Sequence, residues 1–237
     1  MELAEVIGHL ALLRRFPVCA LAGETPSEAL LSAPGMAGDR VFQIVDERTE
    51  TALSSSEEPD LLRYSVRFLD DMVTGEDPAA LARVRTPDGQ ELPLADPAWV
   101  SDLSQRIGRP LRLRPRAPRP EGGLQVLTVP TVRFLESVYG GPLEARRSRA
   151  NFLIDLPDAR AFEEDRWIGK RVRVGETLLE IVGSCHCVVT ALEPETPDRD
   201  LPLLAAALSV RGGAVGVQAR AVSGRRVRVA DPVSLAD

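Results

Sequence analysis

The C-terminal third of the chain is a succession of short runs of strand-forming residues, and this feature limits the fold more than any other. Val, Ile, Leu and Thr recur in these runs, and the segments 174–176 and 222–224 separate them where hairpin turns belong. The expected strands cover residues 151–156, 170–183, 187–192, 213–222 and 225–231. Many short strands with few helices predict a mainly antiparallel β protein that closes, or half closes, into a barrel.

The first ninety residues show the same texture, and helix signals enter only after them. Strands are expected at residues 10–18, 40–46 and 64–70, and a hairpin at 81–94 with Asp88-Gly89 as its turn. Asp96 is an N-cap, Pro97 suits the first helical position and Gly108 is a stop signal, so a helix is expected over 96–110. Residues 111–116 form the next expected strand, and further short helices are expected at 131–140 and 200–208.

Charge and cysteine usage exclude several classes of protein. The net charge is −6, whereas a general nucleic-acid surface needs an excess of basic residues. No window approaches the roughly 20 apolar residues of a membrane helix, and the N-terminal residues are a poor signal peptide. Three cysteines do not make a disulfide framework, so a reducing cytoplasm is the expected location. We expect a small-molecule substrate or cofactor and neither a nucleic acid nor a membrane as partner.

Two of the three cysteines flank a histidine in the stretch Cys185-His186-Cys187. On a strand, residues two apart share a face, so both thiols point one way and His186 points the other. This spacing fits no zinc site, and a disulfide between the two would strain the backbone. Buried apolar thiols, or a thiolate that ligates molybdenum or copper or carries sulfur, remain as interpretations.

The region around these cysteines resembles the core of the MOSC domain, which is named for the C-terminal part of molybdenum cofactor sulfurases. The motifs occur in the family's order: Ser148-Arg149-Ala150-Asn151, the acidic run 163–165 before Trp167 and Gly169, the strand pair through Val174-Gly175, Cys187 before Thr190, and the turn Glu193-Pro194-Glu195-Thr196. Segments 15–24, 33–49 and 57–62 resemble the β-barrel domain that precedes MOSC in larger members.

The resemblance implies a mainly β (α+β) fold in two domains. Residues 1–90 would form a smaller N-terminal β-barrel-like domain, and residues 91–237 would form the MOSC-type β-barrel with a few short helices.

The resemblance also implies a site. Cys187 falls on the family position that ligates molybdenum of a pterin-bound cofactor, and is the expected metal ligand and catalytic residue with Cys185 beside it. The expected cofactor-binding residues are Arg149, Asn151, Arg40, Thr128 and Ser184. A guanidinium fork suits a phosphate or a polar pterin edge, and an amide both donates and accepts.

Three functions follow from this site. The first is an oxidoreductase of the amidoxime-reducing type that holds molybdenum cofactor and reduces N-oxygenated substrates. The second is a metal-free sulfurtransferase in which the Cys187 thiolate or persulfide carries sulfur and Cys185 resolves it. The third is a non-catalytic module that binds a small ligand. The family is also associated with pyridoxal phosphate. With no Rossmann or flavin fingerprint, electrons or sulfur would come from a partner protein.

The chain departs from the family pattern where relatives contact the cofactor phosphate. Cys19 and Ala20 stand where relatives carry Lys-Ser, and Ser56 stands where relatives carry an arginine. Each charge-assisted hydrogen bond to a phosphate contributes roughly 1.5–3 kcal/mol, so these replacements should weaken anion binding. Arg40, Arg63 and Arg149 are the cations that would compensate.

Several further residues have two interpretations each. His186 is a hydrogen-bonded structural histidine or a proton shuttle, and His9 is assigned to structure. Thr128 and Thr131 are helix caps with a secondary claim on the ligand. The run Glu163-Glu164-Asp165 is a solvated turn or part of the site lining. Cys19 is a buried apolar thiol or faces the same cavity as Cys187.

Overall fold

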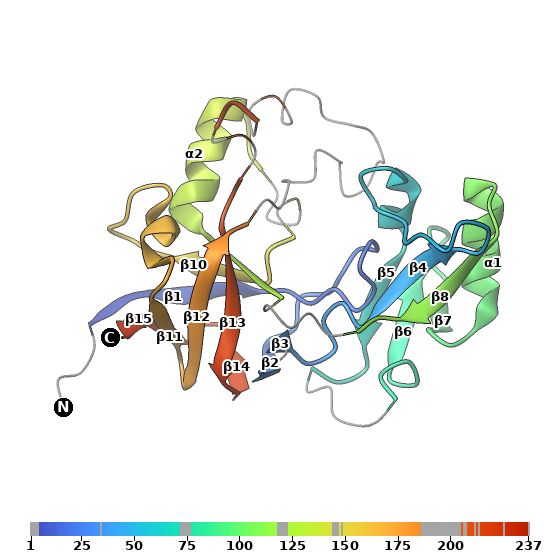
Figure 1. Ribbon diagram of the computed structural model, residues 1–237, viewed down its shortest axis with the longest axis horizontal. Coiled ribbons are helices and arrows are strands. Elements are labelled where there is room, and N and C mark those ends of the chain that lie inside the picture. The colour runs from blue at the N-terminus through green and yellow to red at the C-terminus, as the bar shows by residue number, and fades with distance from the viewer. Residues whose placement is uncertain are drawn as a thin grey trace.

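The structure is a computed structural model that describes residues 5–33, 35–71, 77–117, 123–143, 147, 149–185, 205, 208–210, 212, 214–224 and 226–236. A β-barrel and a second, smaller β structure lie side by side, with the helix α1 (Pro97–Ile107) on the outer side of the second (Figure 1). The predicted mainly β fold is confirmed. Within the described residues, no helix combines the length and the apolar character that spanning a membrane requires.

Seven strands close the barrel in the order β1-β10-β9-β13-β12-β11-β15. Their bounds are β1 (Val6–Leu13), β9 (Leu124–Thr128), β10 (Phe152–Asp155), β11 (Arg171–Val174), β12 (Thr177–Ser184), β13 (Val217–Ser223) and β15 (Pro232–Ala236). The last strand closes the barrel because β15 pairs with both β11 and β1. Alternate residues of each strand fill the interior, among them Leu10, Val126 and Ile181, all at most 1% exposed.

One neighbouring pair in the barrel is parallel, and it sets the place of a helix. β9 and β10 pair in parallel, and the helix α2 (Val129–Tyr139) connects them. Parallel neighbours need such a crossover because a tight hairpin reverses chain direction. The helix ends at Gly140, whose φ of 84° is the left-handed C-cap conformation that glycine adopts without strain.

The second structure has a core of its own. β4 (Phe42–Asp46) pairs with β8 (Leu111–Pro115), and β5 (Ser65–Phe68), β6 (Ala82–Arg85) and β7 (Glu91–Pro93) form a sheet beside them. The 3-10 helix η1 (Pro59–Arg63) and α1 cover this part. Trp99 of α1 is fully buried, and its Nε1 donates to the Leu94 carbonyl at 3.0 Å.

A small sheet links the two ends of the chain. β2 (Glu28–Ser32) lies between β14 (Arg226–Arg228) and β3 (Gly35–Met36). The barrel core therefore takes in residues near the N-terminus, such as Leu13 and Leu31, and the second core takes in Trp99 and Leu111. Residues on both sides of the division expected near residue 90 contribute to each core, and that division stays a prediction.

Caps and turns in the sequence predicted most of these helices and hairpins. Asp96 accepts from the Ala98 amide at 2.9 Å, and Gly108 caps α1 with a φ of 75°, as the sequence predicts. The expected hairpins at Asp88-Gly89 and Gly175 are present. The strand expected over residues 10–18 ends at Leu13, because the following residues leave the barrel to meet the second structure. The expected strand 187–192 and most of the expected helix 200–208 lie outside the described residues.

A buried ion pair lies at the place where the chain leaves the barrel. Arg15 is fully buried, its Nε lies 2.7 Å from Glu24 Oε1, and its guanidinium covers the Phe68 ring at 4.7 Å. Glu24 Oε2 also accepts from the Phe68 amide at 3.0 Å. Gly23 permits this approach, because a Cβ there would lie 2.2 Å from the Arg15 carbonyl oxygen. The pair ties the end of β1 to β5 of the second structure.

We expect Glu24→Gln to lower the free energy of unfolding by roughly 3 kcal/mol or more, because it leaves the buried Arg15 charge without its carboxylate. The matched control is Arg67→Ala, which removes an exposed ion pair with Glu91 and should cost less than about 1 kcal/mol. Urea unfolding followed by circular dichroism measures both. Equal losses in the two variants would contradict a structural role for the buried pair.

Candidate functional site

Three predicted site residues meet where the barrel joins the second structure. Asn151 lies directly before β10, Arg149 lies two residues before Asn151, and Arg40 lies two residues before the first residue of β4. The Arg40 guanidinium donates to Asn151 Oδ1 at 2.9 Å and to the Arg149 carbonyl at 3.1 Å. Residues more than a hundred positions apart in the sequence thus form one connected group.

Phe16 is the centre of this group. The guanidinium carbons of Arg149, Arg14 and Arg40 lie 4.3, 4.9 and 5.0 Å from the centroid of its ring. Phe16 is fully buried, and each cation–π contact contributes about 0.5–2 kcal/mol depending on desolvation. We call Arg14, Arg40 and Arg149 around Phe16 the guanidinium cluster.

Arg149 is held by backbone carbonyls. Its Nη1 donates to the Leu21 carbonyl at 2.9 Å and its Nη2 donates to the Cys19 carbonyl at 2.5 Å. Burial, with the charges of Arg40 and Arg14, lowers the pKa of Arg149 to about 9, although Asp39 and Cys19 act in the opposite direction. The surroundings of this side chain are therefore dry and positive.

Asp39 is the acid of the cluster. Its Oδ2 accepts from the Arg40 Nη1, and its Oδ1 accepts from the Phe16 amide at 2.8 Å. The carboxylate thus fixes Arg40 against the Phe16 backbone. The pKa of Arg149 is lowered in spite of this carboxylate, which acts in the opposite direction.

Both arginines of the predicted site have strained backbones. Arg40 has a φ of 53° and Arg149 a φ of 48°, in the left-handed region that residues other than glycine rarely adopt. Such a conformation costs about 1–3 kcal/mol, and it concentrates at sites where the surroundings hold a side chain in place. The hydrogen bond from Arg40 to the Arg149 carbonyl couples the two strained residues.

Asn151 organises the cluster from inside the protein. It is fully buried, its Oδ1 also accepts from the Gln125 amide at 3.0 Å, and its Nδ2 donates to the Arg14 carbonyl at 3.1 Å. The side chain thus ties β9, the end of β1 and the Arg40 guanidinium together. Its direct contact with a cofactor stays a prediction.

Two positions that depart from the family pattern lie beside the cluster. Cys19 is a partly buried cysteine whose Sγ lies 3.9 Å from the Arg40 carbonyl oxygen, and Ala20 is buried. The third, Ser56, is exposed and bonds to Ser54 through their hydroxyls at 2.6 Å. Arg63 pairs at the surface with Asp60, so of the expected compensating cations Arg40 and Arg149 are the ones in the cluster.

A buried carboxyl lies at the start of α2, away from the cluster. The hydroxyls of Thr128 and Thr131 donate to Glu164 Oε2 at 2.7 and 2.9 Å, and Thr131 accepts from the Phe162 amide at 2.7 Å. Glu164 is fully buried, so the expectation of a solvated turn is wrong for this residue; its side chain turns under α2 instead. Contact of Thr128 with a cofactor stays a prediction.

The sulfur-bearing stretch is described only in part. Ser184 ends β12 and is partly buried, and Cys185 follows it, 1% exposed and disulfide-bonded. Cys187, His186 and Ser148 lie outside the described residues. In the barrel, β13 and β9 lie between β12 and β10, the strand that Arg149 precedes. The roles of Cys185, Cys187 and Ser184 stay predictions.

A metal site built from several described side chains is not found. Among the ranges that the structure describes, no group of three or more His, Cys, Asp or Glu residues is arranged to hold a metal ion. A metal ligated by Cys187 is a separate matter, since that residue lies outside those ranges.

Comparison with known proteins names the domain. The family model of the MOSC domain matches residues 123–234, which include Arg149, Asn151 and both cysteines of the 185–187 stretch. The chain contains a MOSC domain over residues 123–234. The family is associated with the molybdenum cofactor and is related to the sulfurases of that cofactor. The matched residues include β9 to β14 and most of β15. The remaining barrel strand, β1, lies outside the matched residues.

One solved structure has a similar fold over nearly the whole chain, and a second matches about half of it. The YUAD protein from Bacillus subtilis superposes with a TM-score of 0.50 at 11% identity, covering 96% of this chain and 94% of that one. YiiM from Geobacillus stearothermophilus gives a TM-score of 0.38 at 19% identity, covering 49% of this chain and 55% of that one. The search of curated proteins found no match.

We expect Glu164→Gln to flatten the pH dependence of stability of this MOSC-domain protein. Burial raises the pKa of Glu164 above its usual range, although the hydroxyls of Thr128 and Thr131 act against the rise. The folded state therefore holds this proton more tightly than the unfolded state, and the free energy of unfolding falls as pH rises from the unfolded pKa through the folded one. Urea unfolding at pH 4 to 8 measures both proteins. If the free energy of unfolding fell no more steeply with pH in the wild type than in Glu164→Gln, the raised pKa of Glu164 would be refuted.

Proposed function

We propose that the protein binds molybdenum cofactor at the junction of the barrel and the second structure, with the guanidinium cluster holding an anionic part of it and Cys187 ligating the metal. The observation that carries this proposal is the packing of three guanidinium groups, those of Arg14, Arg40 and Arg149, around the ring of Phe16. Burial and the neighbouring charges lower the pKa of Arg149, in agreement with this packing. A dry, positive site favours a bound anion, because the anion relieves the repulsion between the guanidinium groups. The residues present fit the group on this ground.

The strained arginines support the same proposal. Left-handed conformations at both Arg40 and Arg149 cost stability, and neither strand β4 nor strand β10 needs them for its own hydrogen bonds. Such strain is expected where a side chain must be presented in one direction. Arg40, fixed by Asp39 and Asn151, would orient the anionic part, and Arg149 would neutralise it.

The chemistry would be that of a reductase. When bound, the cofactor supplies a metal centre that exchanges electrons with a substrate. Within this proposal the guanidinium cluster binds and orients the cofactor, and Cys187 would be the ligand of its metal. Reduction of N-oxygenated substrates is the proposed reaction, and a partner protein would provide the electrons.

We expect protein from a molybdate-replete host to contain molybdenum at close to one atom per chain, and Cys187→Ser and Arg149→Ala to lose most of it. Arg114→Ala is the control, since Arg114 lies on β8, pairs with Glu50 and is outside the cluster. Elemental analysis of purified protein, with circular dichroism as a check of folding, gives the result. Wild-type protein with only trace molybdenum would end this proposal.

A second candidate function is metal-free sulfur transfer, and the disulfide at Cys185 favours it. A sulfur-transfer cycle forms and breaks sulfur–sulfur bonds. Cys185, two residues before Cys187 in the sequence, takes part in such a bond. Once a thiol reductant has opened the disulfide, the Cys187 thiolate would take the outer sulfur of a persulfide donor, and the donor would leave as a thiol. Arg149 would hold an anionic acceptor.

Under this second function, we expect intact mass spectrometry after treatment with a persulfide donor to show one added sulfur per chain. The addition should be absent in Cys187→Ala and unchanged in Arg114→Ala, the surface control. Undiminished sulfur uptake by Cys187→Ala would exclude this function, whatever the molybdenum content.

A further inference from the structure

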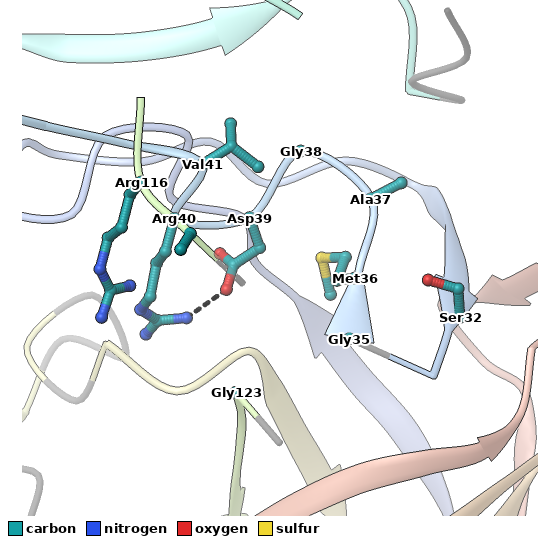
Figure 2. A pocket seen from close by; sticks show the side chains of 11 residues that line it. Ser32, Gly35, Met36, Ala37, Gly38, Asp39, Arg40, Val41, Arg116 and Gly123 are labelled. Atoms are coloured by element: carbon teal, nitrogen blue, oxygen red, sulfur yellow. Dashed lines mark hydrogen bonds and ion pairs between the residues drawn. The ribbon is translucent and has the colours of Figure 1, made fainter. Parts of the chain in front are cut away.

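A pocket of about 170 Å³ opens beside the guanidinium cluster (Figure 2). The loop from β3 to β4, with Met36, Asp39 and Arg40, forms one wall, and Arg116 and Gly123 border it from the other chain segments. The pocket shares Arg40 with the cluster. Residue Arg116 belongs neither to the expected site nor to the segment that matches the MOSC domain.

Arg116 is placed by the strand that precedes it. Its amide donates to the Val41 carbonyl at 2.8 Å, which continues the pairing of β8 with β4 by one residue. Figure 2 shows the Arg116 and Arg40 side chains running next to each other with their guanidinium groups pointing the same way. Across the described ranges, no ion pair of Arg116 is found, whereas Arg112 and Arg114 both reach Glu50, at 2.5 and 3.5 Å.

The charge of the pocket is positive. Arg40 and Arg116 contribute two guanidinium groups to its lining, and Asp39 contributes one carboxylate. The Asp39 carboxylate accepts hydrogen bonds from Arg40 and from the Phe16 amide. It therefore does not neutralise the Arg116 guanidinium, which lines the pocket. A chain of net charge −6 has concentrated positive charge here, which is the condition for binding a small anion.

We propose that this pocket binds the phosphoryl group of the protein's ligand between Arg40 and Arg116. A tetrahedral phosphoryl group offers oxygens to two guanidinium forks at once, and arginine is suited to such bidentate contacts. Arg116 then supplies the cation that Cys19 and Ala20 do not. The inference rests on the proposed function for the identity of the whole ligand, and it adds Arg116 as a residue that holds the phosphoryl group.

The test uses ligand-free protein from a host grown without added molybdate, titrated with inorganic phosphate in a calorimeter at low, constant ionic strength. The wild type should bind one phosphate per chain, and Arg116→Ala should bind it at least about tenfold more weakly, since a charge-assisted contact is lost. Arg114→Ala, two residues earlier on the same strand, should change the affinity less than about twofold.

Acetate and a double variant complete the test. Acetate, which one guanidinium fork satisfies, should bind at least about tenfold more weakly than phosphate. Phosphate binding that is absent in the wild type, equal in Arg116→Ala, or matched by acetate would overturn the assignment. Arg40→Lys combined with Arg116→Ala should abolish saturable binding, and retained binding would place the anion elsewhere. Phosphate binding without molybdenum incorporation would refute only the proposed cofactor, and the reverse result would refute only this inference.

Discussion

Three arginine side chains share the ring of Phe16, and the junction between the barrel and the second structure is built around that contact. Each arginine comes from a different segment: the end of β1, the approach to β4 and the approach to β10. Like charges at this spacing repel, and repulsion with burial lowers the pKa of Arg149. The aromatic face, the carboxylate of Asp39 and several backbone carbonyls hold the group together despite that repulsion.

The remainder of the fold serves this junction. The barrel fixes the start of β10 through its parallel partner β9, and buried Asn151 connects both strands to Arg40. On the other side, the Arg15–Glu24 pair anchors the chain that carries Phe16 to the second structure. Adjacent arginines in the sequence therefore have separate tasks, since Arg14 joins the guanidinium cluster and Arg15 joins the buried ion pair. Arrangements of this kind sacrifice stability at a site for a fixed geometry.

Most of the fold could be predicted from the sequence because the signals for its helices and hairpins are local. Caps at Asp96 and Gly108, and turns at Gly89 and Gly175, act through neighbouring residues, and the structure has the expected helix and hairpins. β9, β2 and β15 were missed, because each is short and takes its place from partners distant in the chain. The same limit applies to the site. Arg40, Arg149 and Asn151 were expected, but Arg14, Asp39 and Arg116 join them only through tertiary contacts. The burial of Glu164 could not be predicted from the sequence, because its acidic neighbours indicate a solvated turn.

The central claim is that burial and the neighbouring guanidinium groups destabilise the charge of Arg149 when no ligand is bound. The direct measurement is the titration of the arginine guanidinium carbons by ¹³C NMR in ligand-free protein, with Arg149→Lys to assign the resonance. The account predicts that the pKa of Arg149 lies below the ordinary range of arginine and that a bound anion moves this value upward. An Arg149 that stays charged through pH 12 without any ligand would contradict the account.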